Sequence, residues 1–334
     1  MKYIKLLHNP TAGEEDHTKQ ELIPLIEAAG WECRYSSTKE KGWDKIEPDT
    51  EFVVVAGGDG TIRKAALTLL EHKFSDKKLP IAVLPLGTAN NISKSLGITG
   101  TVAETIAGWE KGVVKKYDIG RIEGLEETHF LVEGFGYGIF PRLMKVMKKV
   151  DKEKKDTPEK ALQTALEELH HIVLSAEARH YHIQVDGADH SGRFLLVEVM
   201  NSRSIGPNLE LSPQADPGDG QFEIVLVREE AREELANWIK HKIDDETSAY
   251  TFNIIPASKV AIHTEDTLLH ADDELISLEE PARVTVELQM GVLEFWCERR
   301  GDTFPILRKR KVSPLPCSGL CFTDLIPHAA LANE

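Results

Sequence analysis

The sequence predicts a mostly parallel α/β domain followed by an antiparallel, β-sandwich-like domain. In the first hundred residues, short apolar β-branched runs alternate with helix-like patterns, which is typical of parallel strands covered on both faces. From about Tyr117 the pattern changes to short strand candidates separated by turns. A chain of 334 residues is long enough for two domains with full cores.

In the first half, the patterns place the strands at residues 3–7, 31–36, 52–56 and 81–84. Helices are expected around residues 22–29 and 62–70 and from Ile92, with Gly30 and Gly97 closing the first and the last. Strand and helix therefore alternate, as in an open α/β sheet.

The second half contains a helix pattern at 158–174 and strand candidates at 117–122, 128–133, 181–185, 194–200, 222–227, 257–263, 268–270, 282–287 and 293–296. Asp186-Gly187 and Asp219-Gly220 are strong turn signals. We expect domains at 1–120 and 121–300. A tail at 301–334 is either loosely attached or packs back on the first domain.

Composition limits the classes of function. The net charge of −15 argues against general nucleic-acid binding and against a purely electrostatic membrane attachment. No apolar run reaches the length of a membrane span, and the N-terminus lacks the pattern of a signal peptide. Four cysteines give no disulfide framework. These features predict a cytoplasmic protein, peripheral to the membrane at most.

The segment Gly57–Thr61 directly follows the apolar run Val53–Ala56 and opens onto a helix pattern. Such a glycine-rich loop suits phosphate, because its backbone N–H groups and the helix dipole point at the ligand. Asp59 would repel a bare phosphate, so it indicates a bridging Mg²⁺ or a bond to a nucleotide hydroxyl. The alternative is a structural turn capped by Asp59.

Two other polar loops, Asn9–Gly13 and Gly87–Asn91, follow the first and fourth strands. Ligands of open α/β sheets bind outside the carboxyl ends of the strands. We therefore expect all three loops to meet at one crevice.

Together these segments resemble a known family. The ordered set Asn9–Gly13, Gly57–Thr61, Pro85–Asn90 and Asp118–Gly120 is similar to the catalytic domain of diacylglycerol kinases, sphingosine kinases and bacterial lipid kinases, distant relatives of NAD kinases. Similarity continues through residues 130–138, 211–220 and 271–274, so that it spans roughly residues 3–300.

The resemblance implies an active site between the two domains, where ATP and Mg²⁺ phosphorylate a lipid hydroxyl of a diacylglycerol-like or sphingoid substrate. The nucleotide site would contain Asn9, Thr11, Gly57, Gly58, Asp59, Gly60, Thr61, Gly87, Thr88 and Asn90. Asp59, Asn91, Asp118 and Asp219 would belong to metal sites, and Asp59, Asp272 and Glu274 would be catalytic. Glu274 is the expected acceptor of the hydroxyl proton.

Three segments depart from the family pattern, and in one of them, residues 201–207, the usual Gly-Gly is reduced to Gly206. Asn91 stands where the family commonly has an acidic, metal-binding residue, so the Mg²⁺ site should be weaker. Asp273 replaces a turn glycine, and Asp tolerates that left-handed conformation better than most residues. Without the resemblance, Asp118 is equally well explained as a strand-end turn residue, and Asp219 is better explained as a plain hairpin residue. Solvated hairpin carboxylates are the alternative for Asp272 and Glu274.

The expected partners are a lipid and a membrane surface, while a homodimer is left open. Phe135, Tyr137, Ile139 and Phe140 are expected near the mouth of the lipid site. The segment Leu143–Val150 is either an interfacial helix or a solvated helix with one packed face. One alternative to a lipid kinase is an NAD kinase-like enzyme, which is disfavoured because no Asn-Glu pair occurs after the glycine loops until the terminal Asn333-Glu334. The other is a nucleotide-binding regulatory protein with weakened catalysis.

Overall fold

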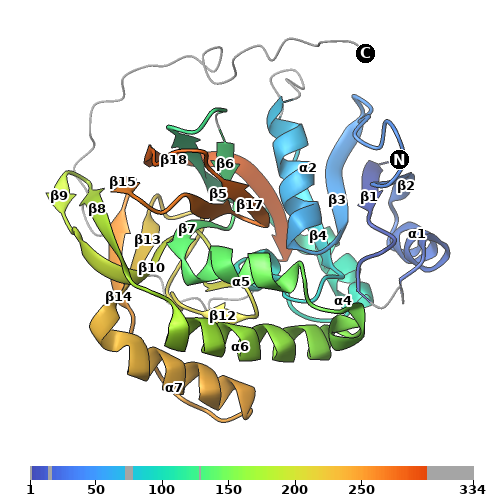
Figure 1. The fold of residues 1–334 in the computed structure, drawn as a ribbon. Coiled ribbons are helices and arrows are strands. Elements are labelled where there is room, and N and C mark those ends of the chain that lie inside the picture. The colour runs from blue at the N-terminus through green and yellow to red at the C-terminus, as the bar shows by residue number, and fades with distance from the viewer. Residues whose placement is uncertain (1, 14–16, 72–77, 128, 299–334) are drawn as a thin grey trace.

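The computed structural model describes residues 2–13, 17–71, 78–127 and 129–298 (Figure 1). The predicted tail at 301–334 lies outside the described residues. A parallel-rich α/β domain is followed by an antiparallel β domain, as the sequence predicts.

Four parallel strands form the sheet of the first domain in the order β4-β3-β1-β2. They are β1 (Tyr3–His8), β2 (Glu32–Ser37), β3 (Thr50–Gly57) and β4 (Ile81–Pro85). His8 pairs with Ala56, and Gly57 pairs with Pro85. Three strands therefore end at the same edge, where the predicted loops begin.

Helices cover both faces of this sheet, as the continuous apolar strands predict. They are α1 (Lys19–Ala28), α2 (Asp59–Glu71), α3 (Asn91–Ser95) and α4 (Val102–Gly108), with the 3₁₀ turn η1 (Trp109–Lys111). Val53 and Val55 of β3 pack with residues of α2, whereas Phe52 and Val54 pack with α1 and α4. This alternation follows from the two-residue period of a strand.

The second domain is built from antiparallel strands around a core of its own. Its strands are β5 (Gly112–Glu123), β6 (His129–Leu131), β7 (Gly134–Gly138), β8 (Arg179–Val185), β9 (Ala188–Asp189), β10 (Gly192–Met200), β11 (Ser204–Ile205), β12 (Leu209–Glu210), β13 (Phe222–Arg228), β14 (Asn253–Ala257), β15 (Lys259–Thr264), β16 (Leu268–Ala271), β17 (Glu274–Ser277) and β18 (Arg283–Glu298).

A layer of helices covers the outer face of β10 and β13 (Figure 1). It contains α5 (Ile139–Met147), α6 (Pro158–Ser175) and α7 (Arg232–Ile243), with the 3₁₀ turns η2 (Lys152–Lys155) and η3 (Glu229–Ala231). Val225 and Val227 face these helices, while Ile224 and Leu226 face the core of the β domain. Among the described helices, none has the length and apolar character needed to cross a bilayer.

The last strand connects the two domains. The predicted strands at 282–287 and 293–296 form one strand, β18, with an irregularity between Gln289 and Leu293. It pairs with β15 and β5 and reaches the first sheet, where Phe295 pairs with Ile81 of β4. Residue 120, the expected end of the first domain, lies inside β5.

Candidate active site

The three predicted loops meet at a groove of about 480 Å³. The groove is lined by Asn9, Thr11, Ala12, Gly13, Thr38, Lys39, Gly58, Gly60, Thr61, Lys64, Gly87, Thr88 and Asp273. Because β1, β3 and β4 are parallel and in register, the loops at their carboxyl ends converge as expected.

Glycines allow two of these loops to touch. A Cβ atom on Gly87 would lie 2.4 Å from the Cα of Gly58, and one on Gly57 would lie 2.6 Å from Oγ1 of Thr61. Both distances are shorter than any real carbon contact, so larger residues would force the loops apart. The glycines are therefore required for the shape of the groove.

Polar side chains fix the loops around the groove. Asn9 donates to Thr61 Oγ1 and accepts from the hydroxyl of Thr11 at 3.0 Å. Asn90, in the left-handed conformation, accepts from the Gly87 amide and donates to the Gly87 carbonyl. Asn90 does not line the groove, and its side chain is used to hold the loop in place.

Two cations that the sequence analysis missed belong to this groove. Lys39 lies just beyond β2, and Lys64 lies on α2 with its ammonium 4.5 Å from the centre of the Trp43 ring. Neither stands in a recognisable motif, because the fold alone brings them to the glycine loops. They give the groove the positive charge that a polyphosphate needs.

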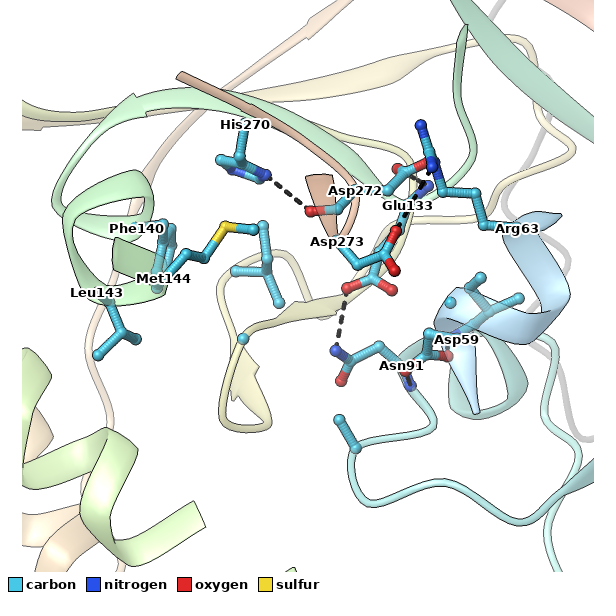
Figure 2. A pocket seen from close by; sticks show the side chains of 15 residues that line it. Asp59, Arg63, Asn91, Glu133, Phe140, Leu143, Met144, His270, Asp272 and Asp273 are labelled. Atoms are coloured by element: carbon cyan, nitrogen blue, oxygen red, sulfur yellow. Dashed lines mark hydrogen bonds and ion pairs between the residues drawn. The ribbon is translucent and has the colours of Figure 1, made fainter. Parts of the chain in front are cut away.

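A second cavity, of about 280 Å³, adjoins this groove between the two domains. Gly60 and Asp273 line both spaces. Figure 2 shows polar residues at one end and apolar residues at the other. The apolar end consists of Phe140, Leu143 and Met144 of α5, together with Ile205 and Ile92.

The expectation for the aromatic segment is only partly correct. Phe140 lines the cavity, but Phe135 and Tyr137 are fully buried in the core of the second domain. Their strand, β7, is paired on both edges, with β10 and β16, and Phe135 and Tyr137 share the face that packs into the core of the β domain. The apolar face of α5 likewise packs inward through Leu143 and Met147, as the packed alternative for this segment predicts.

Asp59 occupies the first position of α2, but its carboxylate caps the N-terminus of a different helix, α3. It accepts hydrogen bonds from the backbone N–H groups of Asn91 and Ile92, at 2.9 and 3.0 Å, where α3 begins. Burial raises the pKa of Asp59 and these amides oppose the rise. Asp59 thereby connects the two glycine loops and also faces the cavity.

Asp272 is a structural carboxylate in the turn between β16 and β17. Its side chain is 4% exposed and accepts from the backbone N–H groups of Val132, Glu133 and Gly134. Arg63 Nε donates to it at 3.0 Å. Asp272 therefore joins α2 of the first domain to the β6–β7 loop of the second.

The other carboxylates of this turn are more exposed. Glu274, 47% exposed, accepts from Arg63 Nη2 at 3.0 Å and lines neither space. Asp273, 61% exposed, lies 3.6 Å from Arg63 Nη1 and covers Gly60. Arg63 contacts all three carboxylates. One feature of the sequence could have indicated Arg63, because this residue follows Asp59 by one helical turn and therefore lies on the same face of α2.

Asp118 and Asp219 lie elsewhere, outside both spaces. Asp118 is buried and accepts from the amides of Gly220 and Gly291 at 2.8 and 2.6 Å. Asp219 accepts from the Gln221 amide. The structure thus brings these two aspartates together at the junction of β5, β18 and the 216–220 loop, apart from Asp59 and Asn91.

Asn91 and Glu133 form the base of the polar end of the cavity (Figure 2). Asn91 is 2% exposed, and its Nδ2 donates to Glu133 Oε1 at 3.0 Å. Its Oδ1 has no hydrogen-bond partner in the described part of the chain. Burial, with the nearby charges of Asp59 and Asp272, holds the pKa of Glu133 well above its usual range.

These oxygens suit a hard divalent cation. Mg²⁺ prefers carboxylate and amide oxygens and usually needs only one or two carboxylates beside phosphate oxygens and water. The orphaned Asn91 Oδ1 and the Asp59 carboxylate both border the cavity. Within the described residues, no group of three or more His, Cys, Asp or Glu side chains converges as a metal cage.

Two protein-family models match the chain in succession. The diacylglycerol kinase catalytic domain matches residues 3–122, and the YegS C-terminal NAD kinase beta sandwich-like domain matches residues 145–294. The diacylglycerol kinase of Bacillus subtilis (strain 168) is 25% identical over 301 residues, covering 82% of this chain and 90% of that protein. The diacylglycerol kinase of Staphylococcus carnosus is 26% identical, over 71% of this chain and 76% of its own.

The fold also has solved counterparts. A crystal structure of a diacylglycerol kinase from Bacillus anthracis superposes with a TM-score of 0.67 at 23% sequence identity. The match covers 89% of this chain and 96% of that one. At this identity the likeness concerns the fold alone.

Proposed function

The chain belongs to the diacylglycerol kinase and bacterial lipid kinase family of transferases, and we propose that it transfers the γ-phosphate of ATP to a lipid hydroxyl. The observation that carries the proposal is the contact between its two spaces. The polar groove and the apolar cavity share Gly60 and Asp273, so a nucleotide in one would place its last phosphate at the entrance of the other.

The groove supplies what phosphoryl transfer requires, which is mostly positioning and neutralisation of charge. Backbone N–H groups of the Gly57–Thr61 loop would hold the phosphates, and Lys39 and Lys64 would offset their charge. Bound Mg²⁺, held by Asp59 and Asn91 Oδ1, would supply further neutralisation.

The proposed proton acceptor is a carboxylate of the β16–β17 turn. For Glu274 to act, it must leave Arg63 when the lipid hydroxyl arrives. Arg63 would then remain paired with Asp272 and stay in place. Asp118 would act at a distance, by holding the 216–220 loop and β18 against β5 through the amides of Gly220 and Gly291. Asp219 would fix its own loop through the Gln221 amide.

The cavity would bind the part of the lipid that lies next to the headgroup, including the start of its hydrocarbon chains. Phe140, Leu143 and Met144 would contact the first methylenes of the chains. The exposed Lys145, Lys148 and Lys149 at the end of α5 would meet anionic headgroups while the enzyme rests on the cytoplasmic membrane surface.

The decisive experiment is transfer of labelled phosphate from γ-labelled ATP and Mg²⁺ to diacylglycerol and a sphingoid base in mixed micelles, with NAD as a parallel acceptor. Labelling of one lipid, abolished in Gly87→Ala, supports the proposal. Gly108→Ala is the matched control, because its nearest neighbour would be the flexible Glu298 side chain at 3.3 Å.

Labelling of NAD instead would contradict the lipid assignment. ATP binding without labelling of any acceptor would favour a regulatory nucleotide-binding role. Both outcomes are compatible with a nucleotide bound in the groove, and they differ from the proposal only in the acceptor of the γ-phosphate.

A further inference from the structure

Glu133 contributes a carboxylate to the cavity from an unexpected place. It lies in the short loop between β6 and β7, and its backbone N–H is held by Asp272 at 2.7 Å. The Asp272 carboxylate also accepts hydrogen bonds from the backbone amides of Val132 and Gly134, so the loop is held on both sides of Glu133. The side chain is thereby directed toward Asn91 of the first domain (Figure 2).

Within the described part of the chain, no cation balances the Glu133 carboxylate when it is ionised. Among the described residues, no lysine, arginine or histidine forms an ion pair with it. Arg63, which lines the same cavity, is already shared by Asp272, Asp273 and Glu274, and Lys94 donates to Asn208. A partly buried carboxylate without a cation is costly, so its retention indicates a ligand that supplies the positive charge.

The Asn91 amide is placed to share that ligand. In this structure it donates to Glu133, and its oxygen is left without a partner. A planar amide carries its donor and acceptor at equivalent positions, so a half-turn presents Oδ1 toward Glu133. Two facing acceptors would repel each other in the free protein, but both would bind a cation placed between them.

We infer that Glu133 is a ligand of the divalent cation, together with Asn91 and Asp59, and that it supplies the charge that Asn91 lacks. The inference rests on the proposed function, since it assigns the cation of that same site. It differs from the sequence-based expectation in placing Glu133, from the β6–β7 loop, beside Asp59 and Asn91. Cation binding would therefore also fix the β6–β7 loop against the first domain.

The test measures cation binding directly, without turnover. Mg²⁺ and Mn²⁺ would be titrated calorimetrically into the full chain saturated with a non-hydrolysable ATP analogue. Glu133→Gln keeps the shape of the side chain and should weaken the cation affinity about tenfold or more, the usual consequence of removing one charged ligand. The matched control is Glu198→Gln, because Glu198 is equally negative and more deeply buried but lies outside the cavity.

A charge exchange makes the test sharper. The double variant Asn91→Asp with Glu133→Gln moves the carboxylate to the neighbouring position and should recover most of the affinity lost in Glu133→Gln. Thermal unfolding of each variant checks that it folds.

Unchanged cation affinity in a folded Glu133→Gln would overturn the inference, as would failure of the charge exchange to recover the affinity. If the wild type binds the cation through Glu133 but labels no lipid, the inference stands and the lipid kinase proposal fails. If lipid is labelled while Glu133→Gln binds Mg²⁺ normally, the reverse holds.

Discussion

Two acidic regions of this molecule look alike in the sequence and differ in the structure. In the cleft between the domains, Asp59 and Glu133 border open space. At the junction of β5 and β18, Asp118 is buried against backbone amides, Glu223 is half-buried and Asp219 is exposed, and none of the three lines the groove or the cavity. Position on the cavity therefore distinguishes the regions, whereas the number of carboxylates does not.

The cleft itself contains both kinds of carboxylate. Asp272 is saturated by three amides and Arg63, whereas each oxygen of Asp59 accepts a single amide at the start of α3 and keeps a lone pair for a ligand. Glu133 has a single side-chain donor, Asn91. A saturated carboxylate stabilises the fold, while one with free lone pairs is available for chemistry.

The largest effect is expected from Asp272→Ala. It leaves Arg63 without its most buried partner and three amides without an acceptor. We expect the free energy of unfolding to fall by about 3–5 kcal/mol, as for other broken buried pairs. Urea unfolding measures it. Asp273→Ala, at an exposed neighbour, is the control, and equal losses in the two variants would refute a structural role.

The next effect concerns activity and compares the two acidic regions directly. Asp59→Asn removes a charge at the meeting point of groove and cavity, and we expect kcat to fall roughly 100-fold, as when a preorganised electrostatic group is lost. Asp118→Asn should act first on stability, through the amides of Gly220 and Gly291, and lower kcat far less. Steady-state kinetics of the two variants measure both losses of kcat. A larger loss in Asp118→Asn than in Asp59→Asn would assign the chemistry to the second region.

A smaller effect is expected at the apolar end of the cavity. Met144→Gln keeps the length of the side chain but adds an amide that must be desolvated. The KM for lipid should rise about tenfold, the lower end of the effect of a methylene-sized change in a hydrophobic pocket, with the KM for ATP unchanged. Met147→Gln on the same helix, facing α6 and not the cavity, is the control. A parallel rise in both variants would show that the helix as a whole is responsible.

The smallest expected effect is a pH dependence of stability that arises in the second region, from Glu223. Burial, with the charges of Asp219 and Asp216, raises the pKa of Glu223 to about 8. The folded protein therefore holds a proton that the unfolded chain releases above its ordinary pKa near 4.5. Stability should fall as the pH rises through this window. Glu223→Gln should reduce that fall by on the order of 1 kcal/mol, seen in thermal unfolding between pH 5 and pH 8, and an unaltered slope would contradict the assignment.

The sequence predicted the polar groove better than the cavity because of how each is assembled. Each groove loop is continuous and directly follows a strand whose position the apolar pattern reveals. The cavity combines α5, the β6–β7 loop, β11 and β16, which no local pattern connects. Glu133 could not be recognised for this reason, although Arg63 could have been found from its helical spacing to Asp59.

The strand β18 has a consequence for how the protein is made. Phe295 completes the sheet of the first domain at β4, although the rest of that sheet has been synthesised by residue 85. During synthesis, neither sheet can therefore be completed until β18 has emerged from the ribosome. Residues 283–298, supplied as a separate fragment, offer a way to reconstitute the protein from two pieces.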